Sequence, residues 1–249
     1  MASIRERLAA KRSVEKSGFR WRAGDVTRLE QFSDAVFAFA LALLVVANEI
    51  PKQGGELLAT LAQFPAFVAT FATFVWIWYY HYLYFRRYGF LDAFTTFLNA
   101  TLLLLILFFV FPLRFIMGAL LDGFMGRGWA FTFAQGRTLM IVYSLGFAAV
   151  FAMFALLYRH ALHLRTELEL DELETVITRS SMTANLLLMG LGLVSASVAW
   201  IGPWWSTPAA GMIYGMTGPL MWWHARRTAR ATATVRQRVA VVEQTPEAA

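Results

Sequence analysis

Six apolar stretches divide the chain, and each is long enough to cross a lipid bilayer as a helix. A membrane-spanning helix needs about 20 residues, because an α-helix rises about 1.5 Å per residue. In the hydrocarbon every backbone N–H and C=O must be bonded within the protein, which favours helices over irregular chain. We place the spans at residues 32–50, 64–85, 93–113, 138–158, 182–201 and 207–223.

The composition agrees with a membrane protein. Hydrophobic residues make up 58% of the chain, charged residues make up 15%, and the mean hydropathy is +0.53. A soluble domain of 249 residues could not bury that much apolar surface. The predicted fold class is therefore an all-α membrane protein with six transmembrane helices. The sequence contains no Cys, so disulfides, thiolate metal sites and Cys nucleophiles are excluded.

The distribution of Lys and Arg predicts how the helices are oriented. If the N-terminus is cytoplasmic, eighteen of the 22 Lys and Arg residues fall in inside segments. Positive residues accumulate on the cytoplasmic side, so both termini are predicted to be cytoplasmic. A basic face beside anionic lipid then explains the net charge of +6, and no nucleic-acid partner is expected. We divide the chain into a basic N-terminal segment (1–31), a six-helix transmembrane domain (32–224) and a cytoplasmic tail (225–249).

Enzyme chemistry is not indicated. Among the four histidines only His160 and His163 are close in sequence, and Arg159 and Arg165 flank them. A cationic neighbourhood disfavours a metal ion, so we interpret both as interface residues rather than ligands. The sequence has no glycine-rich phosphate loop, nucleophile elbow or zinc-protease motif. We therefore predict no enzyme activity, no metal site and no cofactor.

The entrance to the first span carries the sharpest polar signal. It reads R-x-x-x-F-S-D, with Arg28, Ser33 and Asp34 leading into an unbroken apolar run. An ionised carboxylate at the mouth of a membrane helix is costly unless it is paired or hydrated, which makes Asp34 a functional candidate. We expect Asp34 to pair with Arg28, and we favour this over direct contact between Asp34 and an ion.

Three large apolar residues beyond this entrance share one helix face. Phe39, Leu43 and Val46 are spaced i, i+4 and i+7, so they line up over about 10 Å of helix. Alanines alternate with the large residues and allow neighbouring helices to approach closely. From the residues alone, this stripe is either ordinary helix packing or a surface that faces a central axis.

The first three spans resemble a known family. The motif at 28–34, followed by Ala-Val-Phe-Ala-Phe-Ala-Leu-Ala-Leu-Leu-Val, resembles the first helix of the lysosomal/endosomal transmembrane potassium-channel family in its bacterial single-repeat form. Trp78, His81 and Phe85 match the W-x-x-H-x-x-x-F pattern of that family's second helix. Asn99 in the apolar third span is also similar to the family.

The resemblance implies a potassium-permeable cation channel. Its bacterial members are homotetramers in the plasma membrane, and the first helix of each subunit lines a central pore in the lipid bilayer. The sequence has no Thr-Val-Gly-Tyr-Gly run for a carbonyl filter. The implied pore lining is Phe39, Leu43 and Val46, with Phe39 as the constriction that excludes water. Potassium, a monovalent cation, is then the permeant ion rather than a cofactor.

The resemblance also implies roles for residues around the pore. Ala42 occupies a position where several bacterial relatives carry a Thr whose hydroxyl layer is linked to potassium preference, so it is the candidate selectivity layer. The implied polar network holds the first two helices in register. Its members are Arg28, Ser33, Asp34, Trp78 and His81.

Two other classes of function stay open from the sequence. One is a secondary transporter in which Asp34 and His81 carry protons or ions. The other is a non-conducting membrane scaffold whose basic face binds lipid or a partner. Transporters of this size commonly show internal repeats or broken helices near the bilayer centre, whereas the first span contains neither Gly nor Pro in its apolar run.

Overall fold

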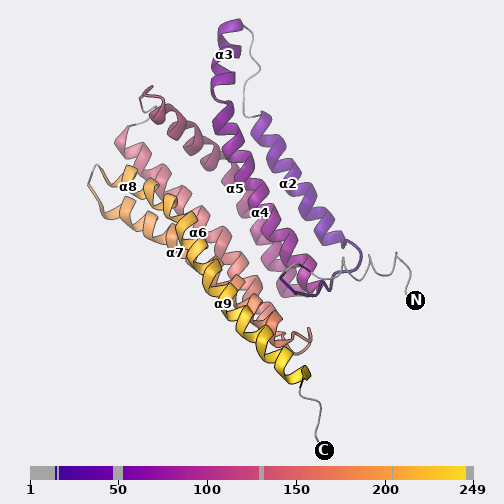
Figure 1. Cartoon of the computed structure of the whole chain (residues 1–249). Helices are drawn as coiled ribbons and strands as arrows, with labels where there is room; N and C mark the ends of the chain where they lie inside the picture. The colour runs from indigo at the N-terminus through magenta and orange to yellow at the C-terminus, as the bar shows by residue number, and fades with distance from the viewer. Residues whose placement is uncertain (1–14, 16, 47–52, 129–131, 204, 245–249) are drawn as a thin grey trace, which may run out of the picture.

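The regular structure is helical throughout the described part of the chain, which comprises residues 15, 17–46, 53–128, 132–203 and 205–244 of this computed structural model. The helices lie roughly side by side along one long axis (Figure 1). In chain order they are α2 (Arg28–Val46), α3 (Gly54–Ala62), α4 (Phe64–Tyr88), α5 (Ala93–Phe124), α6 (Phe133–His163), α7 (Glu172–Ile201), α8 (Ser206–Ile213), the 3-10 helix η1 (Tyr214–Met216) and α9 (Thr217–Gln244).

Four of the described helices are long and apolar enough to cross a membrane, namely α2, α5, α6 and α7. Each corresponds to a predicted span, although residues 47–50 of the first span lie outside the described residues. The second predicted span corresponds to α4, which has 25 residues. Its run of Trp, Tyr and His side chains makes it less apolar than the other four. These aromatic polar residues favour the membrane interface rather than the hydrocarbon centre.

Two predicted helix boundaries were wrong. The third span was expected to end near Pro112, but α5 continues through this residue to Phe124. Proline is tolerated inside membrane helices because neighbouring groups can satisfy the backbone carbonyl that it leaves free. The sixth span was expected at 207–223 as one helix, but it is interrupted by η1. Pro219 lies in the first turn of α9, where a missing backbone N–H costs nothing. Proline at such a position favours the start of a helix.

Side-chain caps explain where three of the long helices begin. Asp92 accepts a hydrogen bond from the Thr95 amide at the start of α5. Reciprocal capping boxes begin α6, between Thr132 and Gln135, and α7, between Asp171 and Glu174. Each box satisfies backbone donors that the first helical turn leaves free. Helix α9 runs without a break across residue 225, the predicted start of the tail.

The helices form two neighbouring groups. Helix α2 packs against α4 and α5, whereas α7 packs against α6, α8 and α9, and α5 contacts α6 between the groups. Gly192 permits the close contact of α6 and α7, because an added Cβ would lie 2.9 Å from the Ser144 carbonyl oxygen. The first turns of α2 and the last turns of α9 lie at the same end of the bundle (Figure 1).

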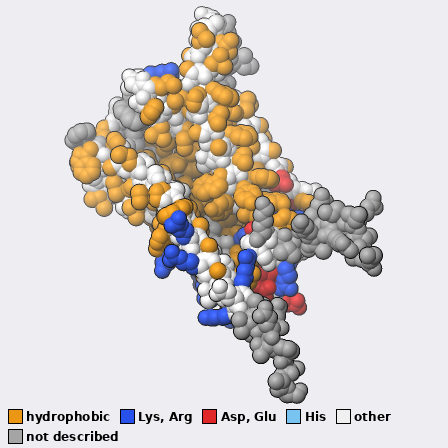
Figure 2. All heavy atoms as spheres, viewed as in Figure 1, with side chains coloured by type: hydrophobic (Ala, Val, Ile, Leu, Met, Phe, Trp, Pro, Cys, Tyr) orange, Lys and Arg blue, Asp and Glu red, His pale blue; other side chains and the backbone are white. Residues whose placement is uncertain are grey.

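Apolar side chains cover the middle of the bundle surface (Figure 2). On the visible face, most of the charged side chains gather toward the end where α9 finishes. Exposed large apolar residues are found on α2, α4, α5, α6, α7 and α9. An apolar belt with charges gathered at one end fits helices that stand in a bilayer.

Candidate functional site

Helix α2 has one face buried in the subunit and one face exposed. Ser33, Phe37, Ala40 and Leu44 are buried at spacings of four, three and four residues, and this face packs against α4 and α5. The side chains on the opposite, exposed face are Ala35, Ala38, Phe39, Ala42, Val45 and Val46. We call these six residues the outer face of α2. The helix therefore presents an apolar surface that the described part of the subunit leaves uncovered.

The predicted stripe is divided between this outer face and its edge. Phe39 is 57% exposed and Val46 is 76% exposed. Leu43 is partly buried and packs against the hydrophobic core. Ala42, the candidate selectivity residue, is exposed on the same side as Phe39. The structure thus brings Phe39, Ala42 and Val46 onto one surface and places Leu43 between that surface and the core.

A buried chain of hydrogen bonds joins α4, α5 and α2. His81 Nε2 lies 2.8 Å from Asn99 Oδ1, and Asn99 Nδ2 donates to Ser33 Oγ at 2.9 Å. Ser33 Oγ in turn donates to the Leu29 carbonyl at 2.7 Å. Because the Asn99 oxygen can only accept, the His81 Nε2 atom must carry the proton. These bonds link Ser33 and His81 through Asn99, so the three helices are held in register.

The carboxylate of Asp34 has a different partner from the one expected. Its Oδ1 atom accepts a hydrogen bond from Trp78 Nε1 at 2.8 Å. Arg28 is exposed, and among the described residues it forms no ion pair with Asp34. Residues six positions apart on a helix point about 120° away from each other, which explains the separation. Asp34 itself is exposed, so its charge can be hydrated.

Two residues of this region were absent from the predicted network. Asn99 forms the centre of the buried chain, and its sequence signal was a strongly polar amide inside an apolar span. Glu30 is buried at the start of α2, where its carboxylate accepts from the Thr27 amide at 2.8 Å. The Thr27 hydroxyl accepts from the Glu30 amide at 3.2 Å, which completes a capping box. The T-x-x-E spacing could have indicated this helix start.

The histidine near the end of α6 is hydrogen-bonded to a carboxylate of the neighbouring helix start. His160 Nε2 lies 2.6 Å from Asp92 Oδ2, so the end of α6 is joined to the start of α5. Partial burial would raise the pKa of Asp92, but hydrogen bonds from Thr95 and His160 outweigh this effect and lower it. Within the described residues, no group of three or more His, Asp and Glu side chains could hold a metal ion.

Comparison with known proteins gives consistent matches. The family model for the endosomal/lysosomal potassium channel TMEM175 matches residues 28–110. A protein from Marivirga tractuosa named "Potassium channel" is 34% identical over 232 residues, which cover 88% of this chain and 94% of that protein. A crystal structure of a variant of the potassium channel MtTMEM175 matches with a TM-score of 0.76 and 34% identity, covering 87% of this chain and 99% of that one.

A second solved structure is similar at lower identity. It is a lysosomal potassium-selective channel TMEM175 homolog from Chamaesiphon minutus, with a TM-score of 0.54 and 26% identity over 81% of this chain and 96% of that one. The four long apolar helices, with α2 held to α5 by a buried hydrogen bond, define a helical, multi-pass integral membrane protein. The chain belongs to the TMEM175 family of potassium channels, as its first three spans predicted. That family is not a class of enzymes.

Proposed function

We propose that four copies of this chain form a potassium-permeable cation channel in a bacterial plasma membrane. In this proposal each subunit crosses the membrane six times, both termini are cytoplasmic, and α2 of each subunit lines a central pore. The names of the relatives support potassium as the permeant ion. The observation that carries the pore assignment is the outer face of α2, which is apolar and uncovered within the described subunit.

Phe39 forms the constriction in this proposal. Its side chain is 57% exposed and begins the large apolar part of the outer face, one to two turns beyond Asp34. Four phenylalanine rings around an axis would expel water and raise a barrier to hydrated cations. Val46 continues the apolar lining, and Leu43 supports it from the edge of the face.

Ala42 sets the expected selectivity. It lies on the outer face one turn after Phe39, so four copies would line the pore next to the constriction. A methyl group offers no oxygen to replace water around a cation, whereas potassium selectivity in channels commonly uses oxygen ligands. We therefore propose that discrimination between potassium and sodium is weak at this layer.

The polar network has a positioning role in the proposal. Ser33, His81 and Asn99 are buried, and Asn99 is bonded to both of the others, so the three fix α2 against α4 and α5. The Trp78–Asp34 bond adds a second link between α2 and α4. Arg28 and Asp34 are exposed at the entrance, where their charges can act on approaching ions.

The test is potassium flux from liposomes that contain equal amounts of protein. Phe39→Asn should wet the constriction, so potassium flux should rise and the discrimination among cations should fall. Phe108→Asn is the matched control, because Phe108 is 61% exposed but lies on α5. If both variants conduct as the parent does, or both conduct equally more, Phe39 does not line the barrier.

The same preparation separates the other two classes of function. A transporter that uses Asp34 or His81 would couple potassium movement to an imposed proton gradient. A non-conducting scaffold would show no flux in the parent or in the Phe39→Asn variant. A channel should pass potassium down its own gradient whether or not a proton gradient is present.

A further inference from the structure

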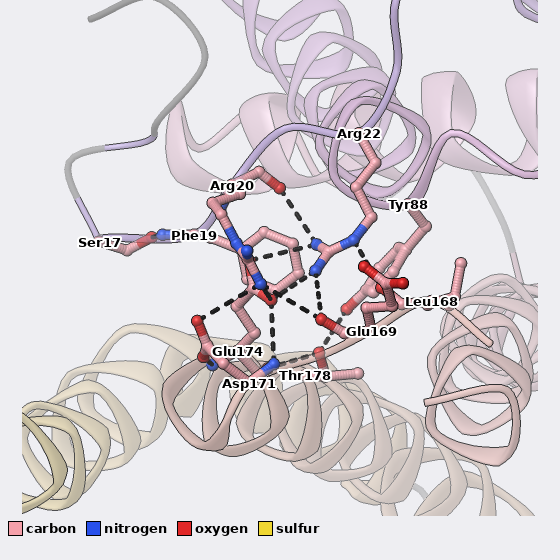
Figure 3. Close-up of polar contacts among 10 residues, drawn as sticks. All are labelled: Ser17, Phe19, Arg20, Arg22, Tyr88, Leu168, Glu169, Asp171, Glu174 and Thr178. Carbon is pink, nitrogen blue, oxygen red and sulfur yellow. Dashed lines mark hydrogen bonds and ion pairs between the residues drawn. The ribbon is translucent and has the colours of Figure 1, made fainter. Parts of the chain in front are cut away.

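A short segment before α2 crosses one end of the helix bundle. We call residues 17–23 the N-terminal strap. Figure 3 shows its arginines, Arg20 and Arg22, converging on Glu174 at the start of α7. Glu174 lies 154 residues after Arg20 and 152 residues after Arg22 in the sequence. The strap is therefore a direct connection between the start of the chain and its C-terminal helices.

Five donors from the strap meet the carboxylate of Glu174. The Arg20 amide donates at 2.9 Å, and its guanidinium donates at 3.2 and 3.1 Å. The Arg22 guanidinium donates at 3.2 and 2.5 Å. The Glu174 side chain is fully buried, whereas that of Arg22 is 19% exposed. Charge-assisted hydrogen bonds to a buried carboxylate are the stronger kind, so this contact resists opening.

Two further hydrogen bonds of Arg22 reach the turn between α6 and α7. Its Nε atom donates to the Leu168 carbonyl at 2.8 Å, and Nη2 donates to the Glu169 carbonyl at 3.1 Å. A planar guanidinium is suited to several acceptors at once. The strap is thus bound both to the first turn of α7 and to the turn that precedes it.

Apolar packing fixes the strap against α4 as well. Phe19 is fully buried, and its ring meets that of Tyr88 edge-on at 5.6 Å between centroids. Tyr88 donates to Thr178 on α7 at 2.7 Å. Gly89 ends α4 with a φ of +62°, and an added Cβ there would lie 2.7 Å from the Ala23 nitrogen. The strap therefore rests in a close backbone contact with the end of α4.

The strap leads directly into the candidate pore helix. Residue 23 ends the strap, Thr27 caps α2, and α2 begins at Arg28. Helix α2 packs against α4 and α5, whereas α7 packs against α6, α8 and α9. Movement of α7 can therefore be transmitted to the start of α2 through the strap.

We propose that Arg20, Arg22 and Glu174 form an ionic latch that couples α7 to the cytoplasmic end of α2. This inference rests on the proposed function, because it makes the latch a control point for the pore. With the latch closed, the entrance of α2 is held in the position described here. When the latch opens, the first turns of α2 gain freedom and potassium flux increases.

The test compares Glu174→Gln with Glu172→Gln in the full-length protein. Glutamine at position 174 keeps the capping box of α7 but loses the charge that holds both arginines. Glu172 is the matched control, because it lies in the same turn and its side chain is 57% exposed. The readouts are amide hydrogen exchange over residues 19–34 and potassium flux from liposomes.

Glu174→Gln should raise exchange in the strap and in residues 28–34 by roughly tenfold, and flux should rise severalfold, while Glu172→Gln matches the parent. Faster exchange in the strap alone would overturn the coupling to α2. Faster exchange in both segments with unchanged flux in a conducting parent would overturn the control of the pore. If the parent protein shows no potassium flux, the channel assignment is contradicted. Amide hydrogen exchange in residues 28–34 of the Glu174→Gln variant still shows whether α7 is coupled to α2. Arg22→Gln opens the latch from the strap and decides the matter if the Glu174 variant does not fold.

Discussion

At the scale of single residues, Asn99 determines how α2 is held. It is fully buried, accepts from His81 and donates to Ser33. Removing this amide leaves the buried His81 Nε2 without an acceptor and takes from Ser33 Oγ the bond that it accepts, although Ser33 still donates to Leu29. Leaving one buried polar group without a partner costs about 1–3 kcal/mol.

Asn99→Ala should therefore lower the free energy of unfolding by about 2 kcal/mol or more beyond the loss in a matched alanine variant. Asn185→Ala is that control, because Asn185 is also buried but donates only to the Ser181 carbonyl. Its Oδ1 atom has no partner among the described residues. Chemical unfolding of both purified variants gives the comparison, and equal losses would contradict a bridging role for Asn99.

Asp34 should affect conduction more than stability. It is exposed and bonded to Trp78, and Asp34→Asn keeps an oxygen that can accept the same bond. The expected change in stability is below about 1 kcal/mol. Loss of one negative charge per subunit at the entrance should lower potassium flux, and the difference should shrink at high salt because ions screen the charge. A flux ratio that does not depend on salt would contradict this role.

At the residue scale, the sequence indicated polar side chains at the start of α2 but not all of the partners that they contact. The polar motif located the entrance of α2, and the packing brought Ser33 and His81 into one network. The Arg28–Asp34 pair was inferred from proximity in the sequence. Residues that are close in sequence do not necessarily lie on one face of a helix. Asn99 lies 66 residues from Ser33, so their contact depends on the packing of α5 against α2.

At the scale of elements, the end of α4 depends on a glycine. Gly89 adopts a φ of +62°, and the Ala23 nitrogen lies 2.7 Å from the position of an added Cβ. Gly126 has a similar φ of +68°, but no atom of the described residues lies within 4 Å of that position. Comparing alanine substitutions at these two glycines separates the free-energy cost of the backbone conformation from the cost of contact with the N-terminal strap.

Gly89→Ala should destabilise the protein by more than Gly126→Ala. Both variants should lose about 1 kcal/mol from the left-handed backbone conformation. Only Gly89→Ala also displaces the strap, so its loss should exceed that of the control by a further 1–3 kcal/mol, roughly the cost of overpacking. Thermal unfolding in detergent measures the difference, and hydrogen exchange in residues 19–23 should rise in Gly89→Ala alone. Equal melting temperatures would mean that the strap does not press on Gly89.

Long apolar runs predicted the positions of α2, α5, α6 and α7 because burial in a bilayer requires such runs. Their ends were harder to predict, since Pro112 is compatible with a helix whose neighbours surround it. Helix α3 was missed because it is only nine residues long and begins with a Gly-Gly pair. The break at η1 lies in a glycine-rich stretch, where length and hydropathy alone do not fix a continuous helix.

At the scale of the whole molecule, the proposed pore implies an assembly of several subunits. One subunit contributes a single pore-like helix, so a closed pore needs several copies around an axis. We expect native mass spectrometry in detergent to give an assembly of four chains of 28.1 kDa each. A stable monomer or dimer in conducting preparations would contradict a central pore lined by α2.

In the buried series of hydrogen bonds, His81 donates to Asn99, Asn99 donates to Ser33, and Ser33 donates to the backbone carbonyl of Leu29. Every bond is therefore donated in the same direction. A proton wire needs groups that take up a proton on one side while releasing another on the other side. A carboxamide and a peptide carbonyl do not titrate at ordinary pH, so they cannot perform this exchange. The brace that joins the three helices is therefore closed to proton hopping, and a proton that crosses the subunit must use a different route.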